Sequence, residues 1–348
     1  MPAHSVHRFR ERRTCFMKQV FKVLSLVIVI MMTFSLVASA QCKYDHDKKI
    51  LIGFAQIGAE SAWRVANTDS IKAEAEARSD CFDLKFSDAQ QKQENQIKAI
   101  RSFIAQGVDV IAFSPVVESG FEAVLQEAKR AGIPVILSDR QVDVEDDSLW
   151  VTFMGSDFVE EGRRSAQWLV DNYEQVKRDD KSMDEVNIVE LVGTVGSGPA
   201  NDRYAGFREV LENYPNFKIL ATQSADFTRA KGKEVMEAFL KAHGDKIDVL
   251  YGHNDDSALG AIQSIEEAGY KPGKDIIVVS IDAVRGAFEA MVEGKLNVTV
   301  ECSPLLGPQL FDAAEDLVMG KDIPKRIVTE EGVFPMEVAE ETLPTRKY

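Results

Sequence analysis

The feature that most constrains this 348-residue sequence is an alternation of short apolar runs with longer amphipathic stretches, which starts near residue 48. In the first half, apolar runs typical of buried strands lie at 49–55, 82–86, 109–113 and 134–138. Between these runs, apolar positions at every third or fourth residue predict helices over 63–78, 91–106 and 121–131. Because strands alternate with helices, we expect a parallel sheet with helices on both faces.

The second half of the chain repeats this plan. Strands are predicted at 186–192, 217–223, 248–252 and 275–281, and helices around 200–213, 228–242 and 256–268. Two features of the first half recur in the second half at nearly the same sequence separation. The run at 109–111 matches the run at 248–250, and Asp139 matches Asp282. Any α/β chain shares some of this pattern, but two related domains explain the recurrence better than chance does.

Composition agrees with two globular domains and narrows the range of partners. Hydrophobic residues make up 45% of the chain and charged residues 28%, which provides enough apolar mass for two cores and excludes wholesale disorder. The 41 basic residues are outnumbered by 56 acidic ones, and the formal charge is −15. Because binding to nucleic acid needs a local excess of lysine and arginine, we expect no nucleic-acid partner.

An apolar stretch near the N-terminus ends in the small residues Ala38-Ser39-Ala40, a pattern that signal peptidases cut after. Its uninterrupted apolar core, 23–32, has about half of the ~20 residues that a membrane span requires. We therefore predict a secretory signal peptide over 1–40, in which Met17 is a plausible true start and 1–16 an upstream extension. The mature chain is then expected in a bacterial periplasm, not embedded in the membrane.

Candidate ligand-binding residues follow the predicted strands, because open parallel sheets bind ligands beyond the carboxyl ends of their strands. In the first half these are Ser61, Trp63 and Arg64, and then Asp139 and Arg140. An indole face can stack on a sugar ring, while guanidinium and carboxylate groups donate to and accept from hydroxyls. The alternatives are a tryptophan that only covers the start of a helix and an Asp–Arg salt bridge within a turn.

In the second half, the candidates are Arg203, Phe227, Asn254, Asp282 and Glu301. Arg203 follows a glycine-rich loop whose spacing is neither that of a dinucleotide site nor that of a P-loop. Asn254 is expected to face the ligand while one of the two aspartates after it caps the next helix. For Asp282 the alternative is a helix cap, and its match with Asp139 favours ligand contact.

The sequence offers no catalytic constellation. It contains neither a GxSxG nor an HExxH motif, and only His46, His243 and His253 follow the predicted signal peptide. The run at 253–256 lacks the spacing of zinc or EF-hand sites. We therefore predict no metal, no cofactor and no enzymatic activity, although a hydrolase with paired carboxylates is not excluded by the residues alone.

At these residues the chain resembles the type I periplasmic sugar-binding proteins of ABC importers, and within them most closely the galactofuranose-binding branch. The segments that carry the resemblance are 53–64, 88–109, 137–143, 190–203, 226–239, 251–256 and 280–284. They span nearly the whole mature chain and together are specific for the family, whereas their specificity for one sugar is much weaker.

The resemblance implies two Rossmann-like parallel-sheet domains joined by a three-segment hinge that closes on the ligand. The crossings would fall near 152–153, 301–302 and 330–331. The N-terminal lobe would comprise 48–152 plus 302–330, and the C-terminal lobe 153–301 plus 331–348.

The resemblance also implies the binding site. Matching motif by motif, the sugar contacts would be Ser61, Trp63, Arg64, Asp139, Arg140, Arg203, Asn254 and Asp282. Phe227 matches an aromatic packing position, and Glu301 stands near a position where related sugar binders often carry glutamine. Carboxylates among these groups suit a neutral, hydroxyl-rich ligand better than a phosphorylated one.

We expect a monomer that captures a monosaccharide, galactofuranose or a related hexose or pentose, and delivers it to the permease of an ABC transporter. The alternative within the same fold is a sugar receptor that feeds a chemoreceptor or sensor kinase. A sugar-responsive repressor is disfavoured, because a secretion signal stands where a helix-turn-helix should be, and an unrecognised secreted sugar-processing enzyme is unsupported.

The cysteines allow one disulfide in the exported chain. Cys42 precedes the first strand and Cys81 directly precedes the second, so adjacent strands would bring the two together. Lipid attachment at Cys42 is not predicted, since Gln41 stands where a small residue should precede it. Cys302, at a hinge crossing, is expected to stay reduced.

Overall fold

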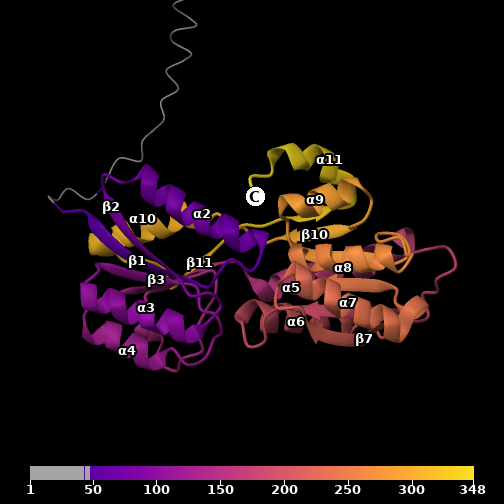
Figure 1. Ribbon diagram of the computed structural model, residues 1–348, viewed down its shortest axis with the longest axis horizontal. Helices are drawn as coiled ribbons and strands as arrows, with labels where there is room; N and C mark the ends of the chain where they lie inside the picture. The colour runs from indigo at the N-terminus through magenta and orange to yellow at the C-terminus, as the bar shows by residue number, and fades with distance from the viewer. Residues whose placement is uncertain (1–42, 44–47) are drawn as a thin grey trace, which may run out of the picture. The chain divides into compact units, whose positions relative to one another are not determined.

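The computed structural model describes Lys43 and residues 48–348, so the predicted signal peptide and Cys42 lie outside the described residues. The first of its two sheets is entirely parallel, with strand order β11-β5-β4-β3-β1-β2 (Figure 1). Its strands are β1 (Ile50–Gln56), β2 (Phe82–Asp88), β3 (Val110–Phe113), β4 (Val135–Ser138), β5 (Thr152–Gly155) and β11 (Arg326–Val328). Strands β3, β4 and β5 are buried throughout, as expected for a sheet that is covered on both faces.

Four helices cover the first sheet. They are α2 (Ala62–Ala77), α3 (Gln93–Gln106), α4 (Glu122–Arg130) and α10 (Gly307–Val318). Helices α2 and α10 pack together over one core, and α3 and α4 over another on the opposite face of the sheet (Figure 1). Because α10 and β11 follow β10 in the chain, the N-terminal lobe is completed only after five strands of the second sheet have been formed.

The second sheet has the order β12-β10-β9-β8-β6-β7 and is parallel except for β12. Its strands are β6 (Val186–Val192), β7 (Phe217–Ser224), β8 (Val249–Gly252), β9 (Ile277–Asp282), β10 (Val298–Glu301) and β12 (Val333–Pro335). The predicted fold class, two parallel-sheet α/β domains, is therefore confirmed, with an antiparallel edge strand in the second sheet.

Helices of the second sheet pack in pairs, α5 with α6 and α7 with α8. The helices are α5 (Phe158–Val176), α6 (Gly198–Leu211), α7 (Arg229–His243), α8 (Asp255–Glu267), α9 (Arg285–Val292) and α11 (Ala339–Thr342). Short 3-10 turns lie at η1 (Asp147–Leu149), η2 (Gly244–Lys246), η3 (Met336–Val338) and η4 (Leu343–Thr345). A Cβ atom on Gly162 of α5 would lie 2.4 Å from the carbonyl oxygen of Arg203, so this glycine lets α5 approach α6 closely.

The chain crosses between the sheets three times, after β5, after β10 and after β11. The first crossing was predicted at 152–153, but residues 152–155 form β5 of the first sheet, so the crossing lies at Ser156 and Asp157. Strand β5 was not among the strands predicted from the sequence. We propose an N-terminal lobe of 48–155 plus 303–328 and a C-terminal lobe of 158–301 plus 333–348.

Among the described residues, every helix is too short or too polar to cross a lipid bilayer.

Candidate functional site

The carboxyl ends of strands from both sheets surround one cavity, which holds about 290 Å³ of empty space. Its lining comprises Glu60, Ser61, Trp63, Arg64, Asp139, Arg140, Phe158, Pro199, Arg203, Phe227, Asn254, Asp282 and Cys302. Every residue predicted to contact the ligand, apart from Glu301, is in this set.

The backbone is unusual at three positions of the cavity wall. Asp139, Phe227 and Asp282 are not glycine, yet their φ angles are 68°, 59° and 125°. Such conformations cost about 1–3 kcal/mol each and are concentrated at functional sites. Asp139 and Asp282 directly end or follow strands β4 and β9, so the strain turns each side chain into the space beyond its sheet.

In the N-terminal lobe, the Arg64 guanidinium is held by two carboxylates. Its Nη2 donates to Asp139 Oδ2 at 2.5 Å, and its Nε donates to Glu60 Oε1 at 3.1 Å. Burial lowers the pKa of Arg64, but the adjacent charges of Asp139 and Glu60 outweigh burial and raise its pKa overall. Arg64 therefore keeps its charge although its side chain is only 2% exposed.

Two buried polar atoms in this wall lack a hydrogen-bond partner. Arg140 Nη1 donates to the carbonyl of Val116 at 3.1 Å, but Arg140 Nε, which lies 3.8 Å from Asp139 Oδ2, has no hydrogen-bond partner within the described residues. Neither has Glu60 Oε2. Burial and the positive charge of Arg64 lower the pKa of Arg140 to about 10, so it remains charged at neutral pH. Buried polar groups normally find partners, so these two are available to a ligand hydroxyl.

In the C-terminal lobe, Arg203 takes the place that Arg64 has in the other lobe. Its Nε donates to Glu161 Oε2 at 2.7 Å, its Nη1 donates to the carbonyl of His253 at 2.6 Å, and its Nη2 lies 3.7 Å from Asp282 Oδ1. Burial lowers the pKa of Arg203, and the charge of Glu161 more than compensates, so its pKa is raised. These contacts hold the Arg203 guanidinium in place with one of its edges facing the cavity.

The carboxyl group of Asp282 differs from that of an ordinary aspartate. Burial raises its pKa well above the usual value, Asp255 and Glu161 add to the rise, and Arg203 opposes it. A raised pKa favours the protonated acid, which can donate a hydrogen bond to a hydroxyl as well as accept one. The C-terminal lobe thus contributes a carboxyl group that can donate a hydrogen bond, and the N-terminal lobe contributes Asp139, which accepts one from Arg64.

Aromatic rings close two sides of the cavity. Trp63 Nε1 donates to the carbonyl of Cys302 at 2.6 Å, and the Arg64 guanidinium lies 4.6 Å from the centre of the indole ring. Phe227 lies between the guanidinium groups of Arg140 and Arg203, 5.4 and 5.9 Å from its ring centre. Neutral, flat ring faces beside charged donors are the chemistry expected for a sugar site.

Hydrogen bonds join the two lobes around the cavity. The backbone N–H of Ala62 donates to Asp256 Oδ2 at 2.6 Å. Asn201 Nδ2 donates to Glu118 Oε2 at 2.7 Å, and the Glu118 N–H donates to the carbonyl of Gly196 at 3.0 Å. The two lobes therefore contact each other on both sides of the cavity.

A family model described as the periplasmic binding protein domain matches residues 52–322. The chain belongs to this family. The galactofuranose-binding protein YtfQ of Escherichia coli is 46% identical over 316 residues, which cover 90% of this chain and 96% of that protein. The predicted resemblance is thus confirmed, and so is the prediction of a binding protein rather than an enzyme.

Two solved structures are similar over the same region. One, from Mycobacterium smegmatis and in complex with β-D-fucofuranose, has a TM-score of 0.82 and 53% identity and covers 86% of this chain and 95% of its own. The other is the periplasmic binding protein component of the arabinose ABC transporter from Shewanella sp. ANA-3, bound to α- and β-L-arabinofuranose. It has a TM-score of 0.80 and 52% identity and covers 85% of this chain and 95% of its own.

Glu301 does not line the cavity, which corrects the expectation for this residue. Its Oε1 accepts from Arg346 Nη1 at 2.8 Å and from the Tyr348 hydroxyl at 2.9 Å, and its Oε2 accepts from the N–H of Gly332 at 3.3 Å. Neighbouring residues of a strand point to opposite faces, so Cys302 rather than Glu301 reaches the cavity. Glu301 instead anchors the C-terminus of the chain.

The cap of helix α8 also differs from expectation. Asn254 itself caps α8, since its Oδ1 accepts from the N–H of Ser257 at 3.1 Å, while its Nδ2 donates to the carbonyl of Phe227 at 3.1 Å. Asp255 accepts instead from Ser280 and Thr299 in the core, and Asp256 joins the lobes through Ala62. One amide side chain therefore caps a helix and also forms part of the cavity wall.

Sequence analysis missed four lining residues, Glu60, Phe158, Pro199 and Cys302. Glu60 and Pro199 lie within segments singled out for their position after strands, but no residue pattern distinguished them from their neighbours. Phe158 begins α5, a helix that the apolar spacing did not identify. Cys302 was placed at a crossing, and only the approach of Trp63 from the other lobe shows that it reaches the site.

Proposed function

We propose that this protein captures a monosaccharide in its furanose form between the two lobes and delivers it to an ABC importer from the periplasm, as a monomer. The observation that carries the proposal is the mixture of hydrogen-bond donors and acceptors in the cavity. The guanidinium groups of Arg64, Arg140 and Arg203 and the carboxyl groups of Glu60, Asp139 and Asp282 line it, and both lobes contribute to each set. Such walls offer many donors and acceptors to a neutral, hydroxyl-rich ligand, whereas a phosphate would also meet the carboxyl groups.

The names of the relatives support the furanose class. The similar proteins are described as binding galactofuranose, β-D-fucofuranose and L-arabinofuranose. These sugars share a five-membered ring and differ in their substituents. We propose that the cavity is shaped for this common ring.

Binding of ¹³C-labelled sugars tests this function. D-galactose, D-fucose and L-arabinose would be added separately to purified mature protein, and the anomeric carbon shift of the bound sugar would identify its ring form by NMR. We expect one furanose form in the bound state of at least one sugar. Exclusive binding of a pyranose would refute the furanose class, and calorimetric heat only from an amino acid, peptide or metal would refute sugar capture.

A further inference from the structure

Donors from all three crossing segments meet at one carboxylate oxygen, Oε1 of Glu331. The Ser156 hydroxyl, from the first crossing, donates to it at 2.5 Å. The N–H of Ser303, from the second crossing, donates at 2.8 Å, and the Thr329 hydroxyl, from the third, donates at 2.9 Å. Hydrogen bonds to an ionised acceptor are about twice as strong as neutral ones, so an ionised Glu331 connects the crossings firmly.

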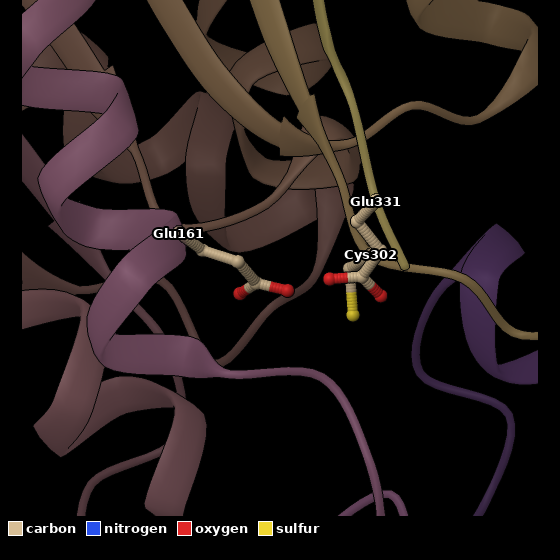
Figure 2. A group of neighbouring side chains, drawn as sticks. All are labelled: Glu161, Cys302 and Glu331. Atoms are coloured by element: carbon tan, nitrogen blue, oxygen red, sulfur yellow. The ribbon is translucent and has the colours of Figure 1, made fainter. Parts of the chain in front are cut away.

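Two further side chains extend this cluster toward the cavity. Figure 2 shows the carboxylate of Glu161, on α5, pointing toward Cys302 and Glu331. The Cys302 sulfur lies 3.2 Å from the Ser156 hydroxyl, and the ligand atoms of Glu161, Cys302 and Glu331 are all within 4.8 Å of one another. Since Glu161 Oε2 accepts from Arg203, hydrogen bonds lead from the wall of the cavity into this cluster.

Glu161, Cys302 and Glu331 are also residue types that bind metal ions. However, Glu331 Oε1 already accepts three hydrogen bonds, and Glu161 Oε2 is occupied by the Arg203 guanidinium. Glu161 Oε1, which has no hydrogen-bond partner in the described part of the chain, the Cys302 sulfur and Glu331 Oε2 remain, fewer than the four protein ligands of a structural zinc site. We therefore interpret the group as a hydrogen-bonded hinge cluster.

We propose that Glu331 is the positioning residue of the hinge: it holds the three crossings in the closed arrangement, beside Glu161, which binds the cavity-lining Arg203. This inference rests on the proposed function, because it concerns how the sugar is retained. Loss of the Glu331 charge weakens two hydrogen bonds to other crossings, from Ser156 and Ser303, and one within its own crossing, from Thr329, without altering a residue that lines the cavity. The closed state should therefore become less populated, and bound sugar should leave faster.

The test compares Glu331→Gln with the matched control Glu330→Gln, which changes an exposed neighbour of the same chemistry. Stopped-flow fluorescence would give the association and dissociation rates for L-arabinose and D-galactose. For Glu331→Gln we expect dissociation about tenfold faster, association within about twofold of wild type, and no change in either rate for the control. Wild-type dissociation from a folded Glu331→Gln protein would overturn the proposal.

The ligand-free protein provides a second measurement that does not depend on the sugar. The chain has three tryptophans, and the indole of Trp63 contacts Cys302 when the lobes meet. With 5-fluorotryptophan incorporated, ¹⁹F NMR would report the closed population, which should fall in Glu331→Gln and not in Glu330→Gln. If no sugar binds to the wild type, the proposed function fails, and this population still decides the role of Glu331.

Two additional variants cover the case in which Glu331→Gln does not fold. Ser156→Ala and Thr329→Val each remove one donor to Glu331 and should each produce a smaller shift in the same direction. Dissociation rates equal to wild type in both would contradict the proposal. Zinc and EDTA should leave all rates unchanged, and a zinc-dependent rate that disappears in Cys302→Ser would replace the hydrogen-bonded hinge cluster by a metal site.

Discussion

Asp109 and Asp248 make the same hydrogen bond in the two sheets. Asp109 Oδ2 accepts from the N–H of Leu51 in β1 at 2.7 Å, and Asp248 Oδ2 accepts from the N–H of Asn187 in β6 at 2.8 Å. In each case the aspartate immediately precedes the third strand of its half and binds the first. The sequence match at these positions therefore reflects an equivalent structural role, which supports two related domains.

Replacement of Trp63 by alanine should abolish sugar binding with little effect on the ligand-free protein. The indole reaches from α2 of the N-terminal lobe to Cys302 and packs with the buried cluster of the C-terminal lobe, so its burial stabilises the contact between the lobes. We expect a loss of affinity of more than about tenfold and a stability loss well below the about 3–5 kcal/mol of a core tryptophan. Calorimetric titration and thermal unfolding would measure both. A large drop in the apo melting temperature would place the indole in the core of one lobe.

Asp139→Asn should weaken sugar binding by disturbing Arg64. The carboxylate accepts the shortest hydrogen bond of this guanidinium, and the amide cannot balance its charge. Loss of a charge-assisted hydrogen bond corresponds to about 1.5–3 kcal/mol, or roughly ten- to hundredfold in affinity. The exposed Asp146→Asn is the control and should bind normally. Equal affinities of the two variants, measured by titration, would show that Asp139 does not act in binding.

Sugar affinity should decrease as the pH rises through about 6. Burial raises the pKa of Asp202 to about 6, with contributions from Glu118 and Asp157 against the opposing charge of Arg203. Glu118 belongs to the other lobe, so closure disfavours the ionised form of Asp202 and takes up a proton. Sugar binding is then strongest at pH values below this pKa and becomes weaker as the pH rises and Asp202 loses its proton.

The control for this prediction is Asp202→Asn, which removes the titrating group. Titrations from pH 5 to 8 should show a flatter profile for the variant than for the wild type. The same slope in both proteins would assign the pH dependence to another group.

Cys81 is disulfide-bonded, and we propose that its partner is Cys42, which lies outside the described residues. Cys302 is a buried free thiol. Alkylation of the exported protein after denaturation without reductant should therefore modify only Cys302, and prior reduction should add two modifications. Reduction should also lower the free energy of unfolding by about 2–4 kcal/mol. Labelling of Cys42 and Cys81 in the unreduced native protein would refute the pairing.

Glu301→Gln should leave sugar affinity unchanged and lower stability. Its carboxylate binds Arg346 and Tyr348 at the C-terminus, and the pair is partly buried. We expect a loss of about 1 kcal/mol in unfolding free energy, measured by urea denaturation, with affinity measured in parallel. A clear loss of affinity without loss of stability would return Glu301 to the binding site.

The alternation of apolar runs with amphipathic stretches was sufficient to predict both sheets and most helices between them. Some elements of the structure were not predicted in this way. Strand β5 and helix α5, which lie on either side of the first crossing, are among them. In the site, position after a strand identified Asp139 and Asp282, because a parallel sheet directs all such positions to one edge.

By itself, the sequence determined the α/β plan, its repetition and the residues at the strand ends, since these depend on local periodicity and on sheet geometry. Only the tertiary structure decided that Cys302 rather than Glu301 faces the cavity, and that Glu331 gathers donors from all three crossings. These outcomes depend on the direction of single side chains and on contacts between segments more than 100 residues apart. No local pattern encodes such contacts, because they form only when both lobes have folded and met.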